Sequence, residues 1–466
     1  MAWTMAEILA ATGGRLVREG DERKFGGIVT NSTKVETGSV FVALKGERFD
    51  GHRFVGDAVS RGAGCVIVHK KLQPTELQSA AVVRVPDTLR ALGDLAHDQR
   101  ERLAPTVLAI TGSNGKTTTK EMLAAIMEEG ILDGEPLSGR VLKTEGNFNN
   151  LVGLPLTLLR LEERHKVAVV ELGTSRPGEI DRLAEIADPD AGIITSVAAA
   201  HLEGLHSLAG VAREKGALYR RVRRGGMIAV NLDDPWVRRA ATRYKGEKIT
   251  YGSRGRVRAE SRRVRPAGGL QFTLHAGRER ARVRLNFLGQ HNITNALGAA
   301  AMAYGTGIKL AAIRRGLESV RPFAMRMQLD EWNGIGIIND AYNANPASME
   351  AALKSLAGIG RGGARIAVLG DMFELGKHSR KQHLDLGAKA AAARVDWLYL
   401  LGQQADAVRT GAVRRGLPPG RIVIGADHAD LAGKLRRRVK KGDWLLFKGS
   451  RASAMEKVLN ELKAQG

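Results

Sequence analysis

The chain has 466 residues, of which 43% are hydrophobic and 26% are charged, and its formal net charge is +23. This length exceeds one ordinary hydrophobic core and favours about three domains, and the composition excludes disordered and fibrous proteins. No apolar run reaches the roughly 20 residues of a membrane span. The first residues lack the basic and apolar regions of a secretory signal, and the single cysteine, Cys65, excludes an internal disulfide. These features favour a cytoplasmic protein.

The positive charge has two interpretations. One is nucleic-acid binding. The other is a surface rich in arginine that attracts anionic small substrates. Basic residues cluster at 220–224, 254–265 and 434–441, but no zinc-finger spacing or RNA-recognition signature accompanies them, and only 5% of the residues are aromatic. Because base stacking needs aromatic side chains, the sequence favours small anionic substrates.

The first segment of the chain alternates short predicted strands and turns. Strands are predicted at residues 27–29, 40–44 and 65–68, with a helix near 52–61. A helix over 89–102 then leads into the next segment. We place the first boundary there, which gives a small α/β domain over residues 1–86.

The middle segment repeats strands and helices. Continuous apolar strands at 107–110, 167–170, 191–194 and 227–230 are typical of a parallel sheet that is covered on both faces. Residues 250–288 look antiparallel and lack long helices, and a helix at about 293–304 follows. We predict a central domain over residues 87–321, with a mostly parallel sheet.

The last segment begins near Arg321 and Pro322. Strands predicted at residues 336–338, 365–369, 397–401 and 444–447 alternate with helices, which indicates a further open α/β sheet. The predicted fold class is therefore α/β, with a Rossmann-like C-terminal domain over residues 322–466.

A glycine-rich loop follows the first strand of the middle segment. Gly112 and Gly115 let the backbone approach an anion, Lys116 can reach the outer phosphates of a nucleotide, and the Thr117 hydroxyl can hold Mg²⁺. A helix that begins here directs its positive end at the same point. The loop is shortened, because Ile110 stands where longer phosphate loops have glycine. The alternative is an ordinary glycine-rich turn.

Three further residues lie at the predicted carboxyl edge of the same sheet. Glu171 ends a buried strand, so it is either a Mg²⁺ ligand or the partner of a nearby cation. His201 follows the next strand, and from composition alone it would be a structural histidine. Lys215 on its own looks like a solvated helix lysine.

A polar turn follows the strand at 336–338. It supplies the Asp340 carboxylate, an aromatic ring and two amides, one of them Asn343, which suit a ribose and an adenine edge. The alternative is a well-satisfied Asx and proline turn.

Taken together, these stretches resemble the Mur ligases. The phosphate loop indicates only the wider amide-ligase superfamily, which includes the folylpolyglutamate synthases. Longer stretches at residues 38–52, 147–155, 340–346, 369–376 and 448–451 narrow the resemblance, which covers essentially the whole chain in order. They favour the branch that joins D-alanyl-D-alanine to UDP-N-acetylmuramoyl-tripeptide.

The resemblance implies a reaction and its partners. ATP phosphorylates the terminal carboxylate of the tripeptide, the amine of D-alanyl-D-alanine attacks the acyl phosphate, and ADP and phosphate leave. The enzyme is then an ADP-forming ligase of peptidoglycan precursor synthesis, with ATP and Mg²⁺ as cofactors. The three domains become a UDP-sugar-binding domain, an ATP-binding domain and a Rossmann-like domain. We expect a monomer, with no nucleic-acid partner and no membrane span.

The resemblance also assigns roles to residues. The expected catalytic residues are Lys116, His201, Lys215 and Arg326. The expected metal ligands are Thr117, Glu171, His201 and Lys215, the last as an N-carbamate. ATP is expected to contact Gly112, Ser113, Asn114, Gly115, Lys116, Thr117, Thr118, Asn295, Arg326, Asp340 and Asn343. The UDP-linked substrate is expected to contact Ser32, Thr33, Lys45, Gly46, Asp50, His52, Asn149 and Asn150.

Two alternatives stay open. A Mur ligase that adds diaminopimelate or lysine is the nearest, but the Asp-Asn-Pro-Arg motif of those enzymes is absent from this sequence. The other is a nucleic-acid-dependent ATPase, which Lys116 and the net charge would allow.

Overall fold

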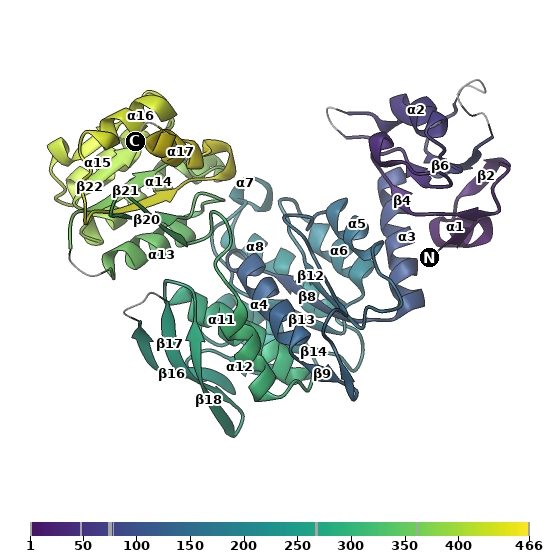
Figure 1. Cartoon of the computed structure of the whole chain (residues 1–466), viewed down its shortest axis with the longest axis horizontal. Coiled ribbons are helices and arrows are strands. Elements are labelled where there is room, and N and C mark those ends of the chain that lie inside the picture. The colour runs from purple at the N-terminus through teal and green to yellow at the C-terminus, as the bar shows by residue number, and fades with distance from the viewer. Residues whose placement is uncertain are drawn as a thin grey trace.

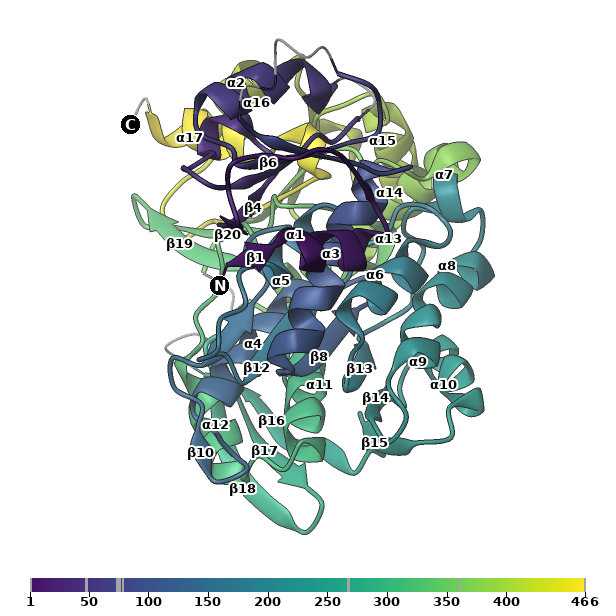
Figure 2. The same cartoon turned by 90° about the vertical axis from the view of Figure 1, so that its right-hand side faces the viewer.

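The computed structural model describes residues 2–46, 49–72, 77, 79–265, 269–359 and 362–464. Its three larger sheets belong to successive parts of the chain (Figure 1). The N-terminal and C-terminal domains lie on opposite sides of the central one, and Figure 2 shows the same arrangement from the side of the N-terminal domain. Residues 47 and 48, within the stretch 38–52 that carries part of the resemblance, lie outside the described residues.

The N-terminal domain is built on a five-stranded sheet in the order β2-β7-β6-β5-β4. Strands β4 (Ile28–Val29), β5 (Val40–Val42), β6 (Cys65–Val68) and β7 (Ala81–Arg84) are parallel, and β2 (Arg15–Arg18) is antiparallel to β7. Helices α1 (Met5–Thr12) and α2 (Val55–Ser60) accompany them, and β1 (Trp3–Thr4) pairs with β3 (Lys24–Phe25). Helix α3 (Thr88–Leu103), capped by Asp87, leads to the central domain.

The central domain has a nine-stranded sheet in the order β11-β12-β8-β13-β14-β15-β16-β17-β18. The parallel part comprises β8 (Thr106–Thr111), β11 (Val141–Lys143), β12 (Val167–Glu171), β13 (Ala191–Ile194), β14 (Met227–Asn231) and β15 (Glu247–Tyr251). The antiparallel part comprises β16 (Val257–Val264), β17 (Leu270–Ala276) and β18 (Glu279–Leu285). A small hairpin, β9 (Ile131–Leu132) with β10 (Glu135–Pro136), follows helix α4.

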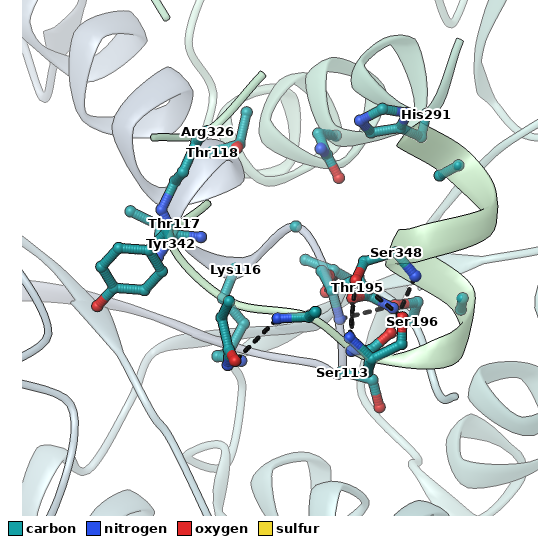
Figure 3. Close-up of a pocket in the computed structure, with 18 of the residues that line it drawn as sticks. Ser113, Lys116, Thr117, Thr118, Thr195, Ser196, His291, Arg326, Tyr342 and Ser348 are labelled. Carbon is teal, nitrogen blue, oxygen red and sulfur yellow. Dashed lines mark hydrogen bonds between the residues drawn. The ribbon is translucent and has the colours of Figure 1, made fainter. Parts of the chain in front are cut away.

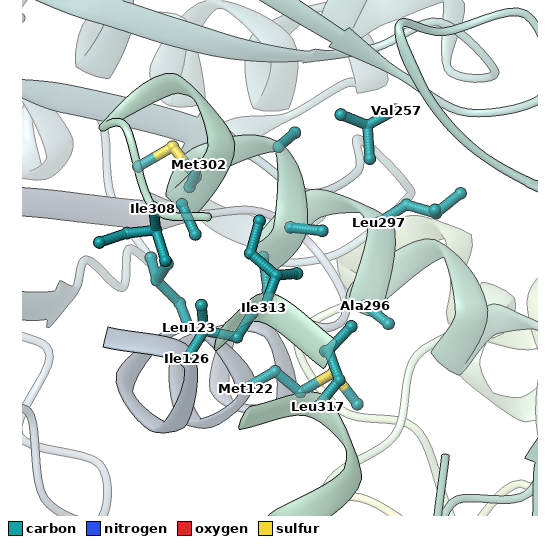
Figure 4. Close-up of a cluster of buried hydrophobic side chains, with 14 of the residues drawn as sticks. Met122, Leu123, Ile126, Val257, Ala296, Leu297, Met302, Ile308, Ile313 and Leu317 are labelled. Atoms are coloured by element: carbon teal, nitrogen blue, oxygen red, sulfur yellow. The ribbon is translucent and has the colours of Figure 1, made fainter. Parts of the chain in front are cut away.

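Helices cover both faces of this sheet. One face packs against α4 (Lys116–Glu128), α11 (His291–Gly305) and α12 (Leu310–Ser319), whose apolar side chains interlock in one buried cluster (Figure 4). The opposite face packs against α3, α5 (Gly153–Leu158), α6 (Glu179–Ala187) and α9 (Ala217–Arg221). Burial on both faces explains why the parallel strands are continuous apolar runs. Helices α7 (Leu202–Leu205), α8 (Leu208–Lys215) and α10 (Pro235–Ala240) complete the domain.

The C-terminal domain has a six-stranded sheet in the order β19-β20-β24-β21-β22-β23. Strands β20 (Ile335–Asn339), β21 (Arg365–Leu369), β22 (Trp397–Leu400), β23 (Ile422–Ile424) and β24 (Trp444–Lys448) are parallel, and β19 (Gln328–Trp332) is antiparallel to β20. Its helices are α13 (Pro346–Ala357), α14 (Ser379–Ala392), α15 (Ala405–Arg414), α16 (His428–Arg436) and α17 (Glu456–Ala464).

The predicted α/β class with mostly parallel sheets is confirmed. One detail differs, because the predicted antiparallel region at 250–288 begins later. Strand β15 pairs in parallel with β14, and the antiparallel ladder starts with β16. Glu247 and Lys248 at the start of β15 are exposed, so this strand has no continuous apolar run to mark it. Among the described helices, none is long and apolar enough to cross a membrane.

Candidate active site

A pocket of about 560 Å³ lies between the central and C-terminal domains. Its floor is the carboxyl edge of the central sheet, where β8 stands between β12 and β13. After β8 the chain forms β11 and β12 on one side of this strand and then β13 on its other side. Ligands bind at such a switch point in open α/β sheets. The other wall comes from the loop after β20 and the end of β24.

The phosphate loop joins β8 to α4 at this point. Gly115 has φ +81°, and a Cβ there would lie 2.2 Å from the Asn295 side-chain oxygen, so only glycine fits. Ser113 and Asn114 are held from the other side, since their backbone amides donate to the Ser196 carbonyl (2.8 Å) and hydroxyl (3.2 Å). Figure 3 shows Ser113, Thr195 and Ser196 together at one end of the pocket. The loop is therefore fixed before any ligand binds.

Glu171 and Thr117 form the polar centre of the floor. The Glu171 carboxylate accepts from the Thr117 hydroxyl at 2.8 Å and from the Asn149 amide at 2.7 Å. Lys116 folds back and donates to the Gly112 carbonyl at 2.9 Å. Burial lowers the pKa of Lys116, and the positive charge of Arg326 lowers it further, against the opposite effect of Glu171. Cations exceed anions here, which favours an anionic ligand.

Lys215 ends α8 and has only 1% of its surface exposed. Within the described residues, its ammonium makes no hydrogen bond or ion pair. Burial holds the pKa of Lys215 well below its usual value, the charge of Lys116 lowers it further, and Glu214 and Glu171 act in the opposite direction. The side chain therefore lies within electrostatic reach of Lys116 and Glu171, although it does not line the pocket itself.

His201 lines the pocket from the loop after β13. Its Nδ1 meets the Glu374 carboxylate of the C-terminal domain, and this hydrogen bond lowers the pKa of Glu374. The two domains thus touch at the edge of the site.

The C-terminal wall is held by Lys448. Its ammonium donates to the Asp340 carboxylate at 2.6 Å and to the Asn343 carbonyl at 2.9 Å, and the Asp340 carboxylate also accepts from the Met327 amide at 3.1 Å. The wall touches the phosphate loop directly, since the Asn345 amide donates to the Asn114 side-chain oxygen at 2.8 Å.

Arg326 lies in the linker between the two domains. Its guanidinium carbon is 3.9 Å from the centre of the Tyr342 ring, and both side chains line the pocket (Figure 3). Asn295, on α11, faces the phosphate loop and donates to the Asn292 side chain at 2.9 Å.

The pocket brings together most of the residues predicted for ATP and metal. Those that line it are Ser113, Asn114, Gly115, Lys116, Thr117, Thr118, Glu171, His201, Asn295, Arg326, Asp340 and Asn343, and Gly112 is absent from the lining. Of the two asparagines predicted to contact the UDP-linked substrate outside the N-terminal domain, Asn149 lines the pocket and Asn150 does not. The Asn150 side-chain oxygen instead accepts from the Val152 and Gly153 amides at the start of α5.

The residues predicted to contact the UDP-linked substrate in the N-terminal domain lie apart from this pocket: Ser32, Thr33, Lys45, Gly46, Asp50 and His52. The His52 ring is buried, and both of its nitrogens are engaged: Nδ1 with Asp50 at 2.7 Å, and Nε2 with the His69 amide at 3.2 Å. Asp50 also accepts from Lys70 at 2.8 Å. The Lys45 and Gly46 backbone lies beside this cluster, because Lys45 forms a bridge with Asp50.

Sequence reasoning included several further residues in the stretches that carry the resemblance but gave them no individual role in the site. Asn345, Lys448 and Arg451 line the pocket, and Glu374 lies behind it. A lysine at the end of the apolar strand β24 is a signal that could have been used, since a buried ammonium needs partners.

The donor set fits Mg²⁺. Within the described residues, no three His, Cys, Asp or Glu side chains gather as a protein-only metal cage. However, Mg²⁺ in nucleotide sites uses one or two protein oxygens together with phosphate oxygens and water. Thr117 and Glu171, hydrogen-bonded to each other at the foot of the phosphate loop, are two oxygen donors of that kind.

Family models match three parts of the chain. Residues 24–100 match the Mur ligase family catalytic domain, residues 110–303 the Mur ligase middle domain, and residues 325–451 the Mur ligase glutamate ligase domain. The chain belongs to the Mur ligase family. The alternative of a nucleic-acid-dependent ATPase of another family is thereby not favoured.

Within the Mur ligases, the similarity extends over the full length. The chain is 35% identical to the UDP-N-acetylmuramoyl-tripeptide–D-alanyl-D-alanine ligase of Bacillus subtilis, covering 94% of this chain and 93% of that protein. It matches a crystal structure of MurF from Acinetobacter baumannii with a TM-score of 0.90 and 34% identity, over 99% of both chains. A MurF ligase from Thermotoga maritima in complex with ADP matches with a TM-score of 0.82 and 29% identity, over 94% of this chain and 97% of that one.

Proposed function

We propose that this Mur ligase joins D-alanyl-D-alanine to UDP-N-acetylmuramoyl-tripeptide, with ATP converted to ADP and phosphate. The observation that carries the proposal is the pocket between two domains, with a phosphate loop on one wall and a polar turn on the other. The full-length similarity to relatives with that printed activity supports it. The enzyme would act in the cytoplasm, where ATP and UDP-linked precursors are found.

The phosphate-binding roles follow from charge. Lys116 would leave the Gly112 carbonyl and turn to the outer phosphates, and the backbone amides of residues 115–118, at the N-terminus of α4, would surround them. Arg326 would neutralise the transferred phosphoryl group from the opposite side. Asp340 and Asn343 would contact the nucleoside of ATP. Asn295 would contact ATP on the side of the phosphate loop. Such groups stabilise the charge that develops as the tripeptide carboxylate attacks the terminal phosphate.

Mg²⁺ would be held by Thr117 and Glu171, with His201 and a modified Lys215 at a second position. When bound, the metal supplies positive charge between phosphate and carboxylate oxygens that otherwise repel one another. Asn149 would keep the Glu171 carboxylate oriented through its 2.7 Å hydrogen bond.

The burial of Lys215 supports its modification as a carbamate. Its lowered pKa favours the neutral amine, which is the form that adds to CO₂; the nitrogen–carbon bond forms and one proton leaves to solvent. The product is an anion at a position where an ammonium has no acceptor within the described residues. Labelled ¹³CO₂ should give a carbamate signal that is lost in Lys215→Ala, and short carboxylates should restore activity to that variant. Rescue by alkylamines instead would show that Lys215 acts as a cation.

The N-terminal domain would hold the UDP moiety. Lys45, Gly46, Asp50, Ser32 and Thr33 are the candidate contacts there, with His52 supporting the loop from below. Asn149 and Asn150 would lie along the path toward the phosphate loop.

One assay tests the reaction. ADP release should require UDP-N-acetylmuramoyl-tripeptide, should rise when D-alanyl-D-alanine is added, and should ignore DNA or RNA. A second arm offers UDP-N-acetylmuramoyl-dipeptide with diaminopimelate or lysine. Turnover in that arm alone would transfer the assignment to the other Mur ligase branch, and stimulation by nucleic acid alone would overturn both.

A further inference from the structure

The contact between His201 and Glu374 joins two domains at the edge of the pocket. His201 precedes α7 of the central domain, and Glu374 lies in the loop after β21 of the C-terminal domain. His201 lines the pocket, whereas Glu374 does not. The Glu374 carboxylate therefore contacts the His201 imidazole without lining the pocket itself.

The backbone of both residues is held in an unusual conformation. His201 has φ +54° and Glu374 has φ +61°, in the left-handed region that non-glycine residues seldom adopt. Such a conformation is unfavourable for a non-glycine residue and persists only where the surroundings enforce it. Two of them meeting across a domain boundary indicates a contact that the fold maintains.

Neighbouring contacts hold the two loops together. The Glu203 amide donates to the Glu374 carbonyl at 3.1 Å. Leu202 and Leu205 on one side share a buried cluster with Met372 and Leu375 on the other. This apolar seam fixes the position of the Glu374 carboxylate relative to the imidazole.

The hydrogen bond has a consequence for the ring. Nδ1 must carry the proton that it donates to the carboxylate, so the lone pair of a neutral imidazole lies on Nε2. Within the described residues, Nε2 has no hydrogen-bond partner. Histidine ligands of metals usually donate their second N–H to a carboxylate in this way, which fixes tautomer and orientation.

We propose that Glu374 is a positioning residue that presents Nε2 of His201 to a divalent metal. The inference rests on the metal role of His201 in the proposed function. Because the acceptor comes from the C-terminal domain, the ligand is oriented only when that domain is docked against α7. Assembly of the metal site is thereby linked to the contact between the domains.

If Glu374 only stabilised the fold, its removal would lower the unfolding temperature and leave the His201 tautomer unchanged; a positioning role predicts the reverse. About half of the Glu374 side-chain surface is exposed, and exposed ion pairs add little to stability. Glu374→Ala should therefore unfold at nearly the parental temperature, while the histidine changes its tautomer.

The test uses the full-length protein with ¹⁵N-labelled histidine and no metal. The His201 signal, assigned by its loss in His201→Ala, should show the proton on Nδ1 in the parental protein and mainly on Nε2 in Glu374→Ala. In a second measurement, Mn²⁺ binding in the presence of ADP should weaken about 10–100-fold in Glu374→Ala. Glu374→Gln keeps an acceptor oxygen and should lie between the two.

Glu203→Gln is the matched control. It removes a carboxylate two residues from His201, and its side chain makes no hydrogen bond or ion pair within the described residues, so tautomer and Mn²⁺ binding should be unchanged. The double variant of His201 and Glu374 should match His201→Ala alone. Parental Mn²⁺ affinity and tautomer in Glu374→Ala, or a further loss in the double variant, would overturn the inference. Parental Mn²⁺ affinity in His201→Ala would instead remove the metal role of His201 from the proposed function.

Discussion

The central and C-terminal domains differ in the hydrogen-bond acceptors that they give to their lysines at and near the pocket. In the central domain, Lys116 on the pocket wall donates only to a backbone carbonyl, and Lys215, which does not line the pocket, has no acceptor within the described residues. On the C-terminal wall, Lys448 is about as buried as Lys215 but donates to the Asp340 carboxylate and the Asn343 carbonyl. An ammonium without an acceptor is costly to bury. The first wall therefore holds charge for a ligand or a modification, and the second uses its charge to build the wall.

The largest effect should come from Lys116→Ala. The cation that offsets charge on the transferred phosphoryl group is lost, and such losses cost about 10²–10³ in rate. The free energy of unfolding should change little, because Lys116 has no carboxylate partner. Turnover at saturating ATP and the melting temperature, measured together, test both statements. A large loss of stability would place Lys116 with Lys448 as a structural lysine.

Replacement of Lys448 and replacement of Lys215 should change the stability of the protein in opposite directions. Lys448→Met leaves the Asp340 carboxylate without its cation and should cost about 3 kcal/mol of unfolding free energy. Lys215→Met removes a buried ammonium without an acceptor and should raise the melting temperature in CO₂-free buffer. Each unit by which the folded-state pKa lies below the unfolded one costs about 1.4 kcal/mol. Urea unfolding of both variants measures the difference. If Lys215→Met is also destabilising, the Lys215 ammonium makes a stabilising interaction in the folded protein.

The pH dependence sharpens the same contrast. The pKa of Lys215 is lowered on folding by burial, so the unfolded state binds more protons between the folded-state pKa and about 10.4. Stability of the parental protein, relative to Lys215→Met, should then rise with pH through that window, by at most about 1.4 kcal/mol per unit. Above it the lysine is neutral in both states and the penalty vanishes. A difference between the two proteins that stays constant with pH would show that Lys215 keeps its usual pKa.

Local pattern predicted one wall better than the other. Glycines, a lysine and a threonine within a few residues identify the phosphate loop, and apolar runs mark the buried strands around it. Lys448 and Asp340 are 108 residues apart, and His201 and Glu374 are 173 apart. No local spacing reports such pairs, because the first forms only when β20 and β24 pair within the C-terminal sheet, and the second only when the C-terminal domain docks against the central domain. Lys215 looks like a solvated lysine until burial is known.

The smallest effect should come from loss of the hydrogen bond between Asn345 and Asn114, which joins the two walls of the pocket. Asn345 donates to Asn114 and also caps α13 by accepting from the Ser348 amide at 2.9 Å. Asn345→Ser should keep the cap, since serine is an equally good N-cap residue, but lose the bridge. One neutral hydrogen bond is worth about 1 kcal/mol, so the KM for ATP should rise about fivefold with little change in melting temperature. Asp427→Ser, which alters the cap of α16 away from the pocket, is the control. An unchanged KM in Asn345→Ser would mean that the two walls bind ATP without this bond.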